Sequence, residues 1–131
     1  MAIDFSKIYV THLPLQIPAP DYTDAAGAVL DFHGVVRGLE GNSTISGLDY
    51  EAYTEMAEIQ LRKIAGETAG KFLLEDAILI HRVGVVPAGE PSLFLRVAAG
   101  HRGEVFAASR EIIERLKQEV PIWKNPVTKP V

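Results

Sequence analysis

Residues 100–124 read GHRGEVFAASREIIERLKQEVPIWK, and the rest of the chain is organised around this segment. Pro121 ends a helix here, because proline lacks an N–H group and disfavours helical backbone at the preceding residue. The segment therefore predicts an apolar strand that leads into His101, then a helix that ends before the PIWK segment. The apolar residues of the helix recur at helical spacing, which predicts a buried stripe of Val105, Ala108, Ile112 and Leu116.

Several candidate functional side chains lie at defined points of this segment. His101 and Arg102 stand where the strand gives way to the helix, Lys117 lies in its last turn, and Lys124 follows Trp123. A helix N-terminus offers unpaired N–H groups, so Arg102 is a candidate for binding phosphate or carboxylate, with His101 as a second contact or proton donor. A lysine near other cations or an aromatic ring can titrate near neutral pH, which makes Lys117 and Lys124 candidates for proton transfer.

Each of these assignments has a purely structural alternative. Arg102 can pair with Glu104, and His101 can be a core histidine bonded to the backbone. Lys117 and Lys124 can be solvated lysines that complement a helix C-terminus. On the residues alone, both interpretations stay open.

The remaining chain predicts strands interleaved with a second helix. Gly34 marks an expected bulge or close approach. The expected elements are strands over 8–10, 27–37, 47–52 and 92–99, a helical turn over 23–26, a polar loop over 38–46, a helix over 53–69, an apolar run over 77–86, a hairpin between 83–86 and 93–97, and an irregular tail over 125–131. This pattern indicates one α+β domain over residues 1–131 rather than a doubly wound sheet.

Residue spacing also defines faces on two further elements. Alternation in the strand over 27–37 places Arg37 on one face with Asp31 and His33, where a surface salt bridge is the structural alternative to a binding role. The other face holds Ala28, Leu30, Phe32 and Val36. The core-facing stripe expected on the first helix consists of Tyr53, Ala57, Leu61 and Ile64, together with Met56 and Gln60.

Composition narrows the classes of function. The absence of cysteine excludes disulfides, thiol catalysis and cysteine-ligated metal sites. The four histidines lack metal-site spacing, so no metal is expected. The net charge of −4 argues against nucleic acid as a partner, but residues 96–131 carry +3 and residues 1–95 carry −7. A basic end on an acidic body suits a small anionic ligand or an acidic protein. With no membrane span and no signal peptide expected, the chain is predicted to be cytoplasmic.

Short motifs occur in a fixed order between residues 27 and 124. They are Gly27-Ala28-Val29 with Phe32, Gly34, Val36 and Arg37; LDYEAYTEMA over 48–57; HRVG over 81–84; Gly89-Glu90; His101-Arg102 with Phe106; and Lys117 followed by PIWK. Any one motif is weak, but together and in this order they resemble the large, catalytic subunit of molybdopterin synthase. The resemblance covers nearly the whole chain.

The resemblance implies a fold and a reaction. The fold is an α+β arrangement of the hammerhead type with mixed or antiparallel sheets. Family members convert cyclic pyranopterin monophosphate into molybdopterin by inserting two sulfurs as a dithiolene. The sulfur comes from a thiocarboxylate on the C-terminal glycine of a small ubiquitin-like subunit, whose tail enters a pocket of the large subunit. Two large subunits form a homodimer with one small subunit at each end, and no metal or organic cofactor is needed.

The resemblance also assigns roles to residues. By position, Lys117 and Lys124 match the family's catalytic lysines. Arg37, His101 and Arg102 match residues that line the substrate pocket, and Phe32 matches a pocket wall. A cyclic phosphate needs cations, and attack by the thiocarboxylate needs proton transfers that lysines can mediate, so the chemistry of these residue types agrees.

One stretch departs from the family pattern. Family members usually carry an acidic residue soon after the WK pair and a longer tail with basic and aromatic residues, whereas this chain continues with Asn125-Pro126. Two alternatives are therefore kept. One is a weakly active or binding-only relative with an altered tail, and the other is an unrelated dimeric domain that binds a small anion.

Overall fold

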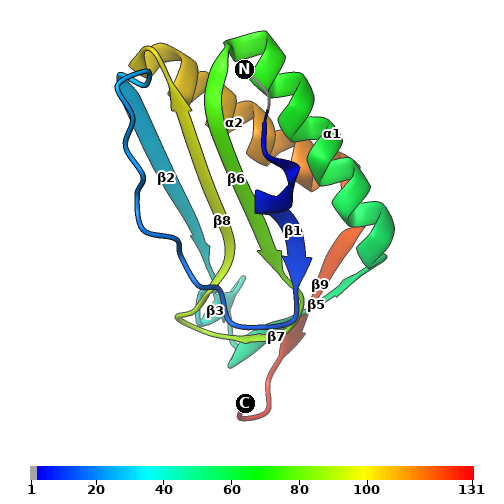
Figure 1. The fold of residues 1–131 in the computed structure, drawn as a ribbon. Helices are drawn as coiled ribbons and strands as arrows, with labels where there is room; N and C mark the ends of the chain where they lie inside the picture. The colour runs from blue at the N-terminus through cyan, green and yellow to red at the C-terminus, as the bar shows by residue number, and fades with distance from the viewer. Residues whose placement is uncertain (1–2) are drawn as a thin grey trace.

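The main layer is a four-stranded sheet with both helices on one face (Figure 1). The structure, a computed structural model, describes residues 3–131. In the sheet order β1-β6-β8-β2, β1 runs parallel to β6, and β8 is antiparallel to both of its neighbours. The elements of this layer are the 3-10 turn η1 (Phe5–Lys7), the strands β1 (Ile8–Thr11), β2 (Ala28–Val35), β6 (Leu74–Arg82) and β8 (Pro91–Ala99), and the helices α1 (Thr54–Phe72) and α2 (Arg102–Glu119).

A smaller sheet closes one end of the molecule (Figure 1). Its order is β7-β5-β9, with β5 antiparallel to both neighbours. Beside it lies a short hairpin of β3 (Leu39–Glu40) and β4 (Ser43–Thr44), within the segment expected to be a loop. The three strands of the small sheet are β5 (Gly47–Ala52), β7 (Gly84–Pro87) and β9 (Ile122–Val127). Two helices with mixed and antiparallel sheets confirm the predicted α+β class.

The main core lies between the helices and the large sheet. The stripe predicted on α2 is confirmed, since Val105, Ala108, Ile112 and Leu116 are all buried. On α1 the prediction is only partly right: Ala57, Leu61 and Ile64 are buried, but Tyr53 is 67% and Met56 56% exposed. The buried arc of α1 continues instead through Ala65, Thr68 and Ala69, so it faces away from Met56.

The hairpin predicted between 83–86 and 93–97 is wrong, because these two segments do not pair with each other. β8 pairs with β6 over the register from Leu74↔Ala99 to His81↔Leu93, and β7 pairs with β5. Gly84, the first residue of β7, has a φ of 86°, a conformation that glycine adopts without a Cβ penalty. The chain therefore leaves the large sheet at this point and continues in the small one.

Of three other local predictions, the bulge at Gly34 is confirmed, the turn over 23–26 is wrong, and the tail over 125–131 is wrong in part. The bulge expected near Gly34 is confirmed by a register shift between Gly34 and Val35. The helical turn expected over residues 23–26 is wrong, because the structure has no helix there. The tail expected to be irregular over 125–131 is wrong in part, because β9 continues to Val127. Pro126 is compatible with this strand because β9 is an edge of its sheet, where a missing N–H costs little.

The bulge also limits the alternation predicted for β2. Ala28 and Leu30 pack against the main core, while Val36 is buried in a separate cluster with Ile45, Leu48 and Val86. Phe32 is 36% exposed. Of the four residues predicted to share this face, only Ala28 and Leu30 therefore pack against the main core.

The outer face of the large sheet is covered by the proline-containing connector between β1 and β2. Ile78, Ile80 and Phe94 form a small apolar cluster there, against which Leu15 packs. Arg96 binds Asp31 through two hydrogen bonds of 2.6 and 2.8 Å, and this guanidinium holds the pKa of the Asp31 carboxyl below its ordinary value. No helix within residues 3–131 is long and apolar enough to cross a membrane.

His81 is expected to make the stability of the fold depend on pH. It is buried in β6, where its Nδ1–H donates to the Arg82 carbonyl oxygen at 2.7 Å, and burial lowers its pKa. In the unfolded chain the imidazole has its ordinary pKa and binds a proton first. The free energy of unfolding should therefore fall as the pH drops below about 6.5, by up to about 1.4 kcal/mol per pH unit for one proton. Urea denaturation between pH 7.5 and 5.5 measures this slope.

The matched variants are His81→Gln and His12→Gln, because His12 is exposed. The His81→Gln chain should be less stable but should lose much of the pH slope, whereas His12→Gln should retain it. Equal slopes in all three chains would show that His81 is not the group responsible.

Candidate functional site

The predicted site residues lie at two opposite ends of the molecule. The register from Ala28↔Ala99 to Val35↔Pro91 defines these ends. We call the end with Ala28, Ala99 and the first turn of α2 the helix-start end, and the end with the sheet β7-β5-β9 the small-sheet end. Helix α2 runs from the first to the second, and Figure 1 shows this course with β5, β7 and β9 gathered at the far end.

Both candidate lysines are at the small-sheet end. Lys117 lies in the last turn of α2 and is exposed. Lys124 lies on β9, exposed, directly across from Tyr50 on β5. The bend at Val120, whose backbone is extended, returns the chain from the helix to this strand. The helix stop at Pro121 is thus what brings the two lysines to the same end.

Arg37 belongs to the same end. It follows β2 by two residues, and its side chain is exposed. The salt bridge considered as its structural alternative is not formed with Asp31, which binds Arg96 instead. Phe32 lies on β2 opposite Leu95, on the side of the strand whose earlier residues meet the helices.

His101 and Arg102 are at the helix-start end. His101 is the N-cap of α2 and makes no capping hydrogen bond with its side chain, which is 86% exposed. The core interpretation of His101 is therefore wrong. Glu104 lies 3.7 Å from His101 Nδ1, and it makes no ion pair with Arg102. The side chains of His101 and Arg102 are thus available to a ligand.

Four cationic site residues differ from most other lysines and arginines because they have no carboxylate partner among the described residues. Within residues 3–131, no carboxylate oxygen lies within 4.0 Å of a side-chain nitrogen of Arg37, Arg102, Lys117 or Lys124. The cations that do have a carboxylate partner are Lys7, Lys71, Arg82, Arg96, Arg110 and Arg115. Arg110 and Arg115 are thus paired with glutamates and not available to a ligand. Cations without a protein counter-ion are suited to an anionic ligand.

One chain does not bring all these residues together. Arg102 and Lys117 are on one unbroken helix, α2, and their separation of fifteen residues corresponds to roughly 22 Å along its axis. A small pterin phosphate does not span that distance.

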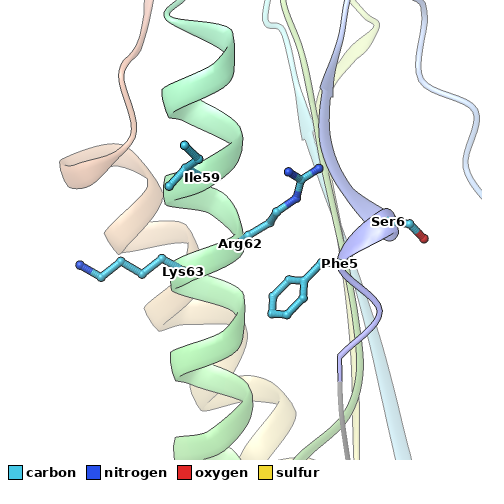
Figure 2. A pocket seen from close by; sticks show the side chains of 5 residues that line it. All are labelled: Phe5, Ser6, Ile59, Arg62 and Lys63. Atoms are coloured by element: carbon cyan, nitrogen blue, oxygen red, sulfur yellow. The ribbon is translucent and has the colours of Figure 1, made fainter.

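Three hollows on the surface of a single chain lie away from the predicted site residues. One is a shallow depression between η1 and α1, lined by Phe5, Ser6, Ile59, Arg62 and Lys63 (Figure 2). Two others lie beneath the connector on the outer face of the large sheet, around Tyr22 and Arg96. None of these three hollows is lined by a predicted site residue.

Sequence reasoning gave no role to a polar cluster behind the small-sheet end. The Tyr50 hydroxyl lies 3.1 Å from Ser92 Oγ, and Arg82 binds Glu90 at 2.8 Å. Arg82 and Glu90 are within the HRVG and Gly89-Glu90 motifs. The sequence does contain a sign of this ion pair, because Arg82 lies inside the apolar run over 77–86 and a buried charge in such a run needs a partner.

Comparison with known proteins identifies the family. Residues 8–119 match the family described as MoaE protein. The molybdopterin synthase catalytic subunit of Thermoplasma volcanium is 40% identical over 102 residues, which cover 78% of this chain and 74% of that protein. The subunit of the same name from Cereibacter sphaeroides is 38% identical over 127 residues, covering 93% and 86%.

Solved structures agree with the sequence relatives. The crystal structure of molybdopterin synthase from Staphylococcus aureus superposes with a TM-score of 0.84 at 29% identity, covering 94% of this chain and 92% of that one. A complex of subunits 1 and 2 of the molybdopterin-converting factor from Helicobacter pylori gives a TM-score of 0.64 at 26% identity, covering 78% and 66%. The chain therefore belongs to the MoaE family of molybdopterin synthase catalytic subunits, which are enzymes of molybdenum cofactor biosynthesis.

Proposed function

We propose that this chain transfers sulfur from a thiocarboxylated small subunit to cyclic pyranopterin monophosphate and so forms the dithiolene of molybdopterin. The observation that carries the proposal is the location of Lys117 and Lys124 at the same small-sheet end, both exposed and without a carboxylate partner within residues 3–131. Attack by a thiocarboxylate and opening of a cyclic phosphate both require proton transfers. Lysine ammonium groups can supply and accept these protons, and they also attract the anionic reactants.

The remaining site residues have binding roles in this proposal. Arg37 at the small-sheet end and His101 with Arg102 at the helix-start end bind the phosphate and the pterin, and Phe32 forms an apolar wall. Because the two groups lie at opposite ends of one chain, the proposed unit is a homodimer in which each pocket takes residues from both copies.

The proposed protein partner is a small ubiquitin-like sulfur carrier. Support comes from the Helicobacter pylori relative, which was solved as a complex of two different subunits. The flexible C-terminal tail of the carrier would bring its terminal glycine to Lys117 and Lys124, where the positive charge favours a thiocarboxylate. The proposed compartment is the cytoplasm.

Reconstitution tests the function. The chain is mixed with the cyclic pterin and with a small subunit that carries either a thiocarboxylate or an ordinary carboxylate. The expected result is dithiolene with the first subunit and none with the second. If the thiocarboxylated subunit gave no dithiolene while a known synthase gave it under the same conditions, the proposed transfer would be wrong.

A binding-only relative is the second candidate, favoured by Asn125-Pro126 directly after Lys124 on β9. The same reconstitution separates the candidates, since a binding-only chain would bind the small subunit and the pterin and release both unchanged.

A further inference from the structure

The Arg82–Glu90 ion pair near the small-sheet end joins a buried arginine to a half-exposed glutamate. Arg82, the last residue of β6, is 8% exposed, and its Nη1 donates to Glu90 Oε1 at 2.8 Å. Its buried Nε has no hydrogen-bond partner among the described residues, so Glu90 supplies the counter-charge alone. Because an unpaired buried guanidinium is costly, Arg82 fixes the place of Glu90 and of the turn that carries it.

That turn holds the segment in front of Arg37. Glu90 lies in the connection between β7 and β8, next to Gly89, whose φ is 90°. The Val36 N–H donates to the Glu90 carbonyl at 3.0 Å, and the Gly89 N–H donates to the Val36 carbonyl at 2.8 Å. Both backbone groups of Val36 are therefore bound to the turn, and its side chain is 3% exposed.

The other side of Arg37 is held as well. The Ile45 N–H donates to the Gly38 carbonyl at 3.0 Å, which closes the short β3–β4 hairpin. The backbone of Arg37 thus lies between two fixed residues. Its own side chain is exposed and has no carboxylate partner within residues 3–131. The hydrogen bonds of this segment therefore position Arg37 through the backbone of its neighbours Val36 and Gly38.

We propose that the Arg82–Glu90 pair is a positioning device for Arg37: it holds the 87–90 turn, which holds Val36, which presents the Arg37 guanidinium to the anionic group of the substrate. Arg82 and Glu90 do not touch the substrate in this account. The inference rests on the proposed function in one respect, the role of Arg37 in binding.

A double-mutant cycle between Glu90 and Arg37 tests the device. Glu90→Gln keeps the shape of the side chain and removes its charge. Because the Glu90 side chain is 46% exposed, the variant is expected to fold. This change should raise the KM for the cyclic pterin about tenfold and leave kcat within about twofold, because a misplaced Arg37 weakens binding. Arg37→Ala should raise KM by at least as much. The double variant should be no worse than Arg37→Ala alone, since the pair acts only through Arg37.

The control is Glu114→Gln, which removes the partner of Arg110 in an exposed pair on α2 and should leave KM unchanged. A purely structural role for Glu90 predicts a different pattern, in which the effects of Glu90→Gln and Arg37→Ala on KM multiply in the double variant. That multiplication, or a fall in kcat with unchanged KM, would overturn the inference.

A second readout does not depend on turnover. Hydrogen exchange of the Val36 amide should become at least about tenfold faster in Glu90→Gln than in the unaltered chain, while the Leu95 amide in β8 should be unaffected. Unchanged exchange at Val36 would overturn the positioning device even in an active enzyme. If the unaltered chain made no dithiolene, the proposed function would fail separately, and the cycle would then be measured as the dissociation constant for the cyclic pterin.

Discussion

Alanine at Lys117 or at Lys124 is expected to lower the single-turnover rate of dithiolene formation by at least about a hundredfold, because a positioned proton donor or acceptor contributes roughly 10²- to 10⁴-fold. The fold should survive, since both side chains are exposed and neither has an ion-pair partner within residues 3–131. Replacements at such positions change the free energy of unfolding by no more than about 0.5 kcal/mol. Rapid-quench measurement of the product gives the single-turnover rate, and the melting temperature of each variant shows whether the fold is retained.

Two further variants make this result specific. Lys63→Ala removes an exposed lysine from α1, far along the chain from the site, and should keep the normal rate. Lys117→Arg and Lys124→Arg retain the positive charge but do not release a proton near neutral pH. If arginine restores binding of the pterin without restoring the rate, the lysines act by proton transfer. Near-normal product formation in both alanine variants would contradict the catalytic assignment.

The parts of the fold that follow from local spacing could be predicted from the sequence. The buried stripe of α2 is confirmed because Val105, Ala108, Ile112 and Leu116 repeat at the helical period, and that period alone determines which face is apolar. The helix stop before Pro121 and the bulge at Gly34 are also local effects of one residue on its own backbone. Such effects act within a few residues and leave a direct trace in the sequence.

The pairing of distant strands could not be predicted in the same way. Apolar alternation in 83–86 and 93–97 is compatible with a hairpin, but it carries no information about which strand lies alongside. The structure has a positive φ at Gly84, at the point where the chain passes from the large sheet into β7, which pairs with β5 in another sheet. The same holds for Asn125 and Pro126, which enter β9 because β5 offers a free edge.

The candidate site shows the same division. Residue types and the family resemblance predict which side chains to consider, and the predicted helix already separates Arg102 from Lys117. The positions of Lys124 and Arg37 at the same end as Lys117 depend on the sheet registers. The Arg82–Glu90 pair was missed because its importance depends on hydrogen bonds from Val36 to the turn at Gly89 and Glu90, more than fifty residues further along the chain.

A pocket shared between two copies of the chain is the second large expectation. Arg102 and Lys117 lie roughly 22 Å apart along α2, yet the proposed reaction needs both near one substrate. A two-fold dimer with antiparallel placement of the two helices brings Arg102 of one copy to Lys117 of the other, and it does so twice. Phe106, one turn after Arg102, is 62% exposed and offers apolar surface for such a contact.

Mixed dimers of two inactive variants test this arrangement most directly. Arg102→Ala and Lys117→Ala chains are each expected to be nearly inactive alone. After subunit exchange, a mixed dimer with a shared site has one pocket with both defects and one intact pocket. Since about half of the dimers are mixed, the dithiolene yield should return to about a quarter of that of the unaltered protein. Absence of recovery, with exchange shown independently by native mass spectrometry, would place each site within a single chain and contradict the shared pocket.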